Sequence, residues 1–263
     1  PSANRFGHVS PTRASHVLDD LADKGVKVLN GESAALPVDA SCEVGIESTV
    51  VKLDASQRKL LIYRQGAVTQ QHLQDCLAQA NQPWGTAVVS RVVKMHADKQ
   101  AGEPSEQDGA AGEVAPGQAV THYAPDVPCY LVHGVSSSAS SSAASSSGIE
   151  LVQGELLVTK AALAAGAVVV DFGGQLADLS AQALAYRDLS AAKDTAEAAH
   201  GLFDTLRWAE GVAGARLVLL AQVDAAAHSS DGQKTLDIRL GLADRVFRAA
   251  SGVSVQVHVL SDA

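Results

Sequence analysis

The residues of this chain that are best suited to chemistry lie in a predicted β-hairpin. Two short runs of apolar and β-branched residues flank a polar turn, and we assume the register in which Leu53 faces Leu60. Counting outward from that pair places Thr49 opposite Arg64. The hydroxyls of Ser48 and Thr49 would then lie beside a guanidinium, a combination that could bind a phosphate or a carboxylate. A plain hairpin with an exposed arginine has the same spacing.

Two further groups of polar residues could contact an anionic ligand. Ser2 and Asn4 are two apart, so in an extended segment their hydroxyl and amide would point to one side, toward phosphate oxygens or a ribose. His122 and Tyr123 add a titratable ring and a phenol to a stretch that its prolines keep extended. From the residue types alone, a polar terminal loop and a packing or capping role are the simpler interpretations of these two groups.

The elements that must position these residues predict an α/β protein. From Cys129 onward, short apolar strands alternate with helices, which argues for a parallel, Rossmann-like arrangement. The expected strands are 130–132, 155–158, 167–172 and 216–221, and alternating valines over 253–259 predict a half-exposed edge strand. The expected helices are 159–165, one capped by Thr195, and one that directs Leu240, Ala243, Phe247 and Ala250 inward.

The part before Cys129 predicts fewer elements around the hairpin. Ser10 or Thr12 should cap a helix, and Thr69 a second one that buries Cys76. The apolar face expected for the first helix is Ala14, Val17, Leu18 and Leu21, and 26–29 is an expected buried strand. Because Lys99–Glu113 has no large apolar residue, we expect a first domain over 1–98, a linker over 99–126 and a second domain over 127–263.

Composition excludes several classes of function. The formal net charge is −9, which does not suit strong direct binding of nucleic acid. Three cysteines without C-x-x-C spacing indicate reduced thiols, and they assign no metal ligand. No apolar run approaches the roughly 20 residues that span a bilayer. We therefore expect a cytoplasmic protein without a membrane segment, and a chain that begins without Met is expected to be a fragment or a processed product.

Several strings in the chain resemble one known family. Pro-Ser-Ala-Asn-Arg-Phe-Gly-His-Val-Ser-Pro-Thr at the start, Gly-Ile-Glu-Ser-Thr-Val-Val and Tyr-Arg-Gln-Gly-Ala-Val are similar to signatures of the YrdC-like family. Ala115–Pro125 resembles the interdomain linker of the long, two-domain threonylcarbamoyl-AMP synthases. Segments around Leu202 and Leu242 resemble their C-terminal domain. Gln65 departs from the usual proline of the family, and Gln118–Val120 depart from its methionine, lysine and aromatic residue.

The resemblance implies both a fold and an activity. The chain would hold the C-terminal part of a YrdC-like twisted sheet domain, a linker and a Rossmann-like domain. The parent protein would be a nucleotidyltransferase that makes L-threonylcarbamoyl-AMP from L-threonine, bicarbonate and ATP, with Mg²⁺ on the ATP phosphates and release of pyrophosphate. The product would pass to a tRNA threonylcarbamoyltransferase for the t6A modification of adenosine 37 in tRNA.

The resemblance also implies which residues line the nucleotide and substrate site, namely Ser2, Asn4, Ser48, Thr49, Arg64, His122 and Tyr123. The first two would face the nucleotide phosphates, the arginine would hold an anionic group, and the last two belong to a linker that closes over the site; catalytic residues stay unassigned. The N-terminal part of the family, with a Lys-x-Arg motif, is not in this sequence, so we expect no catalysis by this chain alone. The alternative is a non-catalytic YrdC-like module that binds nucleotide or RNA or has a regulatory role.

Overall fold

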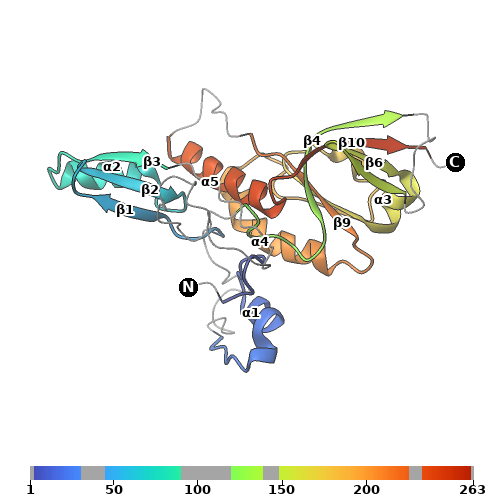
Figure 1. Ribbon diagram of the computed structural model, residues 1–263, viewed down its shortest axis with the longest axis horizontal. Helices are drawn as coiled ribbons and strands as arrows, with labels where there is room; N and C mark the ends of the chain where they lie inside the picture. The colour runs from blue at the N-terminus through green and yellow to red at the C-terminus, as the bar shows by residue number, and fades with distance from the viewer. Residues whose placement is uncertain (1–2, 31–44, 90–119, 139–147, 225–232, 262–263) are drawn as a thin grey trace, which may run out of the picture.

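The computed structural model describes residues 3–30, 45–89, 120–138, 148–224 and 233–261. Within these residues the strands form two separate sheets, one of three strands and one of seven. Figure 1 shows the two sheets at opposite ends of the molecule, with long helices between them. The mixed α/β architecture agrees with the sequence prediction, whereas Ser2 and the predicted linker segment 99–113 lie outside the described residues.

The small sheet is built around the predicted hairpin. Strands β1 (Val50–Asp54) and β2 (Lys59–Arg64) are antiparallel. Helix α2 (Gln70–Gln79) then carries the chain to β3 (Gly85–Val88), which lies parallel to β2. The hydroxyl of Thr69 caps α2 by accepting a backbone N–H of its first turn, as predicted.

The large sheet contains the strands that follow the predicted linker. Its order is β5-β6-β10-β4-β9-β7-β8, and every pair is parallel except β5 with β6. Both β7 and β9 are buried along their whole length, as expected for parallel strands with both faces covered. The strands are β4 (Cys129–Ser138), β5 (Ile149–Val152), β6 (Glu155–Thr159), β7 (Ala167–Asp171), β8 (Ala185–Asp188), β9 (Leu217–Ala221) and β10 (Ser254–Leu260).

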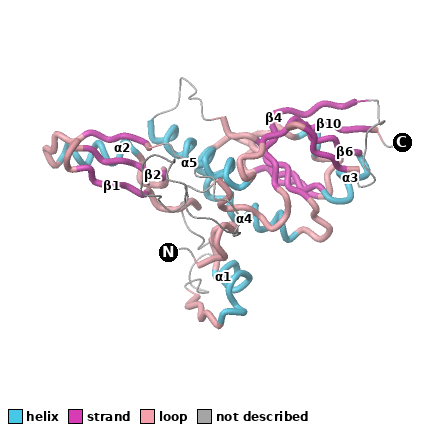
Figure 2. The backbone as a smooth tube through the Cα atoms, viewed as in Figure 1, coloured by secondary structure: helices cyan, strands magenta, loops and turns pink. Residues whose placement is uncertain are grey.

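Two long helices lie between the two sheets. Figure 2 shows α4 and α5 in the centre, between the strands of the small sheet and those of the large sheet. Among the residues that the structure describes, no helix is long and apolar enough to cross a membrane. The helices outside the small sheet are α1 (Ala14–Leu21), η1 (Ala22–Lys24), α3 (Lys160–Gly166), η2 (Ala177–Leu179), α4 (Thr195–Gly211) and α5 (Gln233–Ala249).

The prediction that 253–259 forms an edge strand is wrong, because β10 lies inside the sheet between β6 and β4. Its valines from 255 to 259 are buried on one face. The other face carries His258, whose ring nitrogens lie 2.8 Å from the hydroxyl of Ser136 and 3.2 Å from the carboxylate of Glu155. Polar partners on both neighbouring strands therefore produce an alternation that resembles an exposed edge.

Three smaller predictions are also wrong. Residues 26–29 form no strand, and Leu29 is almost fully exposed. Cys76 is exposed on α2, and this helix has no buried residue. Asp194, and not Thr195, caps α4, because its carboxylate accepts two backbone N–H groups of the first turn.

The first helix buries a different face from the one that its apolar residues predict. The buried residues of α1 are His16 and Asp20, whereas Leu18 is exposed. Asp20 accepts a hydrogen bond from Arg207 of α4 at 2.8 Å, and both side chains are buried. Burial alone would raise the pKa of Asp20, but hydrogen bonds from Arg207 and His8 outweigh it and hold this pKa well below its usual range. A polar contact thus orients α1.

Replacing Asp20 by alanine should lower the free energy of unfolding by about 3–5 kcal/mol, because the charge of Arg207 would stay buried without its partner. Arg13 offers a matched control, since its ion pair with Asp204 is partly exposed. Alanine at Arg13 should cost less than about 1 kcal/mol. Urea denaturation followed by circular dichroism measures both values, and equal losses in the two variants would contradict the central role of the buried pair.

Candidate functional site

The predicted hairpin forms, but its register near the site differs from the prediction. Leu53 pairs with Leu60, as expected. A β-bulge between Val50 and Val51, at the start of β1, then places Val50, and not Thr49, opposite Arg64. The reason is that a bulge inserts one unpaired residue and bends the strand, which a count along two regular strands cannot include.

The bulge nevertheless brings two of the predicted site residues together. The half-buried Arg64 donates a hydrogen bond from Nε to the carbonyl oxygen of Ser48 at 3.0 Å. Its Nη2 lies 3.3 Å from the hydroxyl of Ser48. The guanidinium is thereby fixed beside an exposed hydroxyl, and this fork geometry suits a carboxylate or a phosphate.

The hydroxyl of Thr49, also predicted to line the site, bonds to the protein itself. This hydroxyl donates to the carbonyl oxygen of Val68 and accepts the N–H of Gly66 at 3.1 Å. Both partners lie in the turn that follows β2, whereas Thr49 precedes β1. Thr49 therefore holds this turn in place, and its hydroxyl is already committed to the protein.

Glu47 and Arg245 form a buried ion pair that joins the small sheet to α5. Arg245 is fully buried, and its Nε lies 3.2 Å from a carboxylate oxygen of Glu47. Its Nη1 donates to the carbonyl oxygen of Gln65 at 2.5 Å. The other oxygen of Glu47 accepts the hydroxyl of Ser10 at 2.5 Å. Loops from both sides of the hairpin and the N-terminal segment thus meet at this ion pair.

The predicted His122–Tyr123 pair lies against this junction. The two rings are 4.1 Å apart between centroids, and Tyr123 is fully buried against Phe203 of α4. Tyr123 has a backbone φ of 63°, in the left-handed region that residues other than glycine seldom adopt. The guanidinium of Arg245 lies 5.9 Å from the centre of the Tyr123 ring.

Several buried polar atoms at the junction lack a hydrogen-bond partner among the described residues. These atoms are Nε2 of Gln65, Nδ1 of His122, the hydroxyl of Tyr123 and Nη2 of Arg245. His122 contacts Tyr123, and Arg245 contacts both the ring of Tyr123 and the backbone of Gln65. Buried polar atoms are nearly always hydrogen-bonded, so such a group indicates a place for a ligand or for bound water. We call these four side chains the junction group.

The two aromatic members of the junction group are neutral at physiological pH. Burial lowers the pKa of His122 below its ordinary value, and the charges of Arg64, Arg248 and Arg245 add to this effect against that of Glu47. Burial raises the pKa of Tyr123 to about 12. The pair can therefore donate or accept hydrogen bonds toward a ligand without adding charge.

The N-terminal loop runs beside the segment that carries His122. The backbone N–H of Ala124 donates to the carbonyl oxygen of Gly7 at 3.0 Å, and His8 forms a β-bridge with Ala124. Asn4 donates from Nδ2 to the carbonyl oxygens of Arg5 and His8 at 3.1 and 3.0 Å. Both amide hydrogens of Asn4 thus shape the loop.

Reasoning from the sequence missed Glu47 and Arg245. The predicted inward face of the last helix was Leu240, Ala243, Phe247 and Ala250, whereas the buried apolar residues of the chain from 242 onward include Leu242, Val246, Ala249 and Ala250. Arg245 lies on this true buried face, next to Val246. The available signal was a charged residue inside an apolar helical stretch, together with the glutamate that directly precedes Ser48.

Comparison with known proteins gives one family for most of the chain. A family model described as the threonylcarbamoyl-AMP synthase C-terminal domain matches residues 68–251. A curated threonylcarbamoyl-AMP synthase of Bacillus subtilis (strain 168) is 28% identical over 134 residues, which are 51% of this chain and 30% of that protein. The aligned region is thus less than a third of that relative.

Solved structures agree with the fold. The crystal structure of P. abyssi Sua5 complexed with L-threonine has a TM-score of 0.58 at 19% identity, and the match covers 98% of this chain and 59% of that one. A variant of P. abyssi Sua5 in which a histidine and the next tyrosine are both alanine has a TM-score of 0.55 at 18% identity, with coverages of 98% and 58%. At these identities the likeness establishes the fold alone.

Gly66 to alanine should disturb the site, because an added Cβ would lie 2.2 Å from the carbonyl oxygen of Glu47 and 2.6 Å from the backbone nitrogen of Thr49. Both atoms are backbone and cannot rotate away, so we expect a loss of about 1–3 kcal/mol in unfolding free energy. Gly85 is the control, since a Cβ there would have its nearest neighbour at 3.8 Å. Chemical denaturation measures the unfolding free energy of both variants. A Gly66 variant as stable as the Gly85 variant would refute this packing.

Proposed function

Because the chain belongs to the family of the threonylcarbamoyl-AMP synthase C-terminal domain, we propose that it supplies the C-terminal part of an L-threonylcarbamoyladenylate synthase. In this proposal L-threonine, bicarbonate and ATP react to give threonylcarbamoyl-AMP and pyrophosphate. The product is handed to a tRNA threonylcarbamoyltransferase for the t6A modification, in the cytoplasm. The observation that carries the proposal is the junction group, which includes the His122–Tyr123 pair that the sequence resemblance assigns to the site.

The chemistry of the reaction fits the groups near the junction. The reactants carry carboxylate, bicarbonate and phosphate groups, so catalysis depends mainly on positioning and on compensation of negative charge. Arg64 and Ser48 offer a guanidinium and a hydroxyl to one such anionic group. His122 and Tyr123 offer neutral donors or acceptors from the linker, and Arg64 is close enough to His122 to lower its pKa.

The remaining predicted residues have supporting roles in this proposal. Thr49 positions the turn after β2, and Asn4 shapes the N-terminal loop through its two amide hydrogens. Ser2, which lies outside the described residues, keeps its assignment to the nucleotide phosphates. Mg²⁺ would arrive with ATP, since it binds mainly to phosphate oxygens and few carboxylates. Glu47 is committed to Ser10 and Arg245, so we assign no Mg²⁺ ligand to the described residues.

A tetra-anionic nucleotide needs more positive charge than the described part of this site offers. Glu47 neutralises the charge of Arg245. Among the site residues predicted from the sequence, Arg64 is then the main cation, in a chain of net charge −9. The proposal therefore assigns further cations to the part of the longer relatives that this chain does not match.

The chain alone should show no threonine-dependent release of pyrophosphate from ATP. Fusion to the N-terminal part of a longer relative should restore release that requires both threonine and bicarbonate, measured with a coupled pyrophosphate assay. Turnover by the isolated chain at about 1 s⁻¹ or above would refute the incomplete-site argument. A folded fusion without activity would refute the synthase assignment and favour a non-catalytic binding or regulatory module.

In the active fusion, Arg64 to alanine should weaken binding of ATP or of the product about ten- to a hundredfold, the loss expected when a charge-assisted contact of roughly 1.5–3 kcal/mol disappears. Lysine should restore only part of the affinity, because a point charge does not reproduce the guanidinium fork. Isothermal titration calorimetry measures the affinities.

The control for this experiment is Arg58 to alanine, which removes a guanidinium from the turn at the far end of the same hairpin. This variant should bind as the unmodified fusion does. If the Arg64 and Arg58 variants bind equally well while both remain folded, Arg64 has only a structural role in the hairpin.

A further inference from the structure

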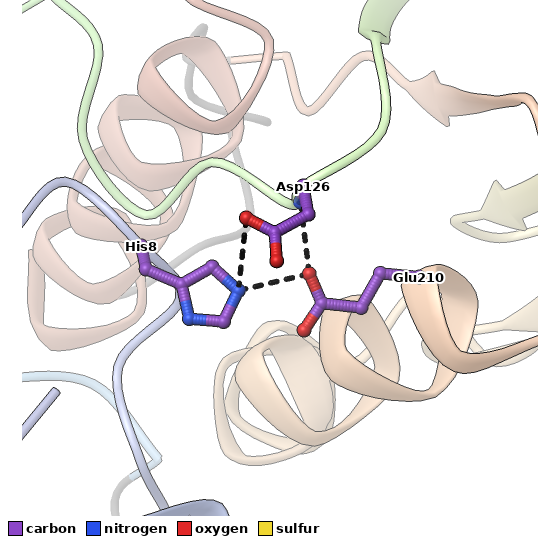
Figure 3. A group of neighbouring side chains, drawn as sticks. All are labelled: His8, Asp126 and Glu210. Atoms are coloured by element: carbon purple, nitrogen blue, oxygen red, sulfur yellow. Dashed lines mark hydrogen bonds and ion pairs between the residues drawn. The ribbon is translucent and has the colours of Figure 1, made fainter. Parts of the chain in front are cut away.

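A second cluster of ionisable side chains lies apart from the junction group, where the N-terminal loop meets the linker and α4 (Figure 3). We propose that His8, Asp126 and Glu210 bind one divalent transition-metal ion, with Zn²⁺ as the reference ion. The ligand atoms are Nε2 of His8 and one carboxylate oxygen from each of the two acidic residues. The proposal does not depend on the catalytic function proposed above.

The distances between the ligand atoms suit a small ion. Nε2 of His8 lies 2.9 Å from Oε2 of Glu210 and 3.9 Å from Oδ1 of Asp126. All three ligand atoms lie within 4.8 Å of one another. A tetrahedral Zn²⁺ with bonds of roughly 2.0–2.2 Å keeps its ligands roughly 3.3 Å apart. Small side-chain rotations therefore bring all three atoms onto one ion and leave a fourth position for water.

The histidine is oriented as a metal ligand requires. Its Nδ1 lies 2.8 Å from Oδ1 of Asp20, so its Nε2 faces the cluster. Asp20 is itself held by Arg207, and both side chains are buried. A carboxylate on the far nitrogen of a ligand histidine fixes the tautomer and raises the basicity of the ring, and it is the usual partner of histidine in metal sites.

The charge of the cluster and its accessibility from solvent also favour binding of a cation. Oδ2 of Asp126 accepts a hydrogen bond from Arg5 at 2.6 Å, which leaves Oδ1 toward the histidine. Arg5 and Arg207 pair with Asp20 and Asp126, and Glu210 adds a third carboxylate that contacts His8 and the backbone N–H of Asp126. With His8 neutral, as a metal ligand must be, the three carboxylates exceed the two guanidinium groups by one negative charge. Asp126 is exposed, so an ion can enter from solvent.

The position of this site gives the ion a structural task. Its ligands come from three segments that are far apart in the sequence, namely the N-terminal loop, the linker and α4. Asp126 follows Tyr123 closely, and the intervening Ala124 already forms a β-bridge with His8. A bound ion would therefore fasten the linker just beyond its His122–Tyr123 pair.

The test uses the intact 263-residue chain after removal of metal with a chelator. Calorimetric titration with Zn²⁺ should show one equivalent bound, and Co²⁺ should give the visible absorption of a tetrahedral site with nitrogen and oxygen ligands. Glu210→Gln and Asp126→Asn, which keep the size of each side chain, should each weaken Zn²⁺ binding at least tenfold. Asp20→Asn should weaken it about 10- to 100-fold by loosening the histidine.

His258→Asn is the matched control, because His258 pairs with Glu155 at 3.2 Å in a second histidine–carboxylate contact, to which the described part of the chain adds no third ligand. Zn²⁺ should bind this variant as it binds the unmodified chain. No saturable binding at submillimolar Zn²⁺ would overturn the proposal. So would binding that survives in folded Glu210→Gln, or a Co²⁺ spectrum with thiolate bands, since either result assigns the ion to other residues.

Discussion

The structure depends on the buried contact between Arg245 and Glu47. Taking a guanidinium out of water is unfavourable by several kcal/mol unless protein groups replace its lost hydrogen bonds. Arg245 obtains these bonds from the carboxylate of Glu47 and the carbonyl oxygen of Gln65, one on each side of the hairpin. The small sheet is thus attached to α5 through polar bonds with defined directions, and the position of Arg64 relative to the linker follows from this attachment.

Helix α4 contains a second arginine with the same task. Arg207 donates to the carboxylate of Asp20 and to the carbonyl oxygen of Val9, so it orients both α1 and the N-terminal loop. Buried ion pairs add little net stability relative to well-packed apolar residues, but the loss of one partner is strongly unfavourable. The two arginines therefore specify geometry more than stability. They account for the packing of Val9 and Tyr123 in the core of the large sheet.

Local patterns predicted the parts of the fold where apolar burial decides the conformation. The buried strands β7 and β9, the hairpin and the helix after Thr69 follow from apolar runs and from a capping residue. The predictions failed where a distant polar partner decides. Asp20 is buried because Arg207 lies beside it although 187 positions separate them, and β10 is polar on one face because both neighbouring strands offer partners. The hydrophobic periodicity of a segment carries no information about polar partners that lie far away in the sequence.

The residues of the candidate site also divide into those that local patterns predicted and those that they did not. Arg64 and Ser48 could be placed together from hairpin geometry. For His122 and Tyr123 the residue types left a packing role open, and only the resemblance assigned them to the site. Glu47 and Arg245 were not found at all. Each buried polar atom without a partner is unfavourable by about 1–3 kcal/mol. A ligand that satisfies the junction group recovers this free energy, and it does so only while the linker and the hairpin loops are docked on α5. If a ligand binds the junction group as proposed, its binding and the docking of the segment that carries His122 stabilise each other.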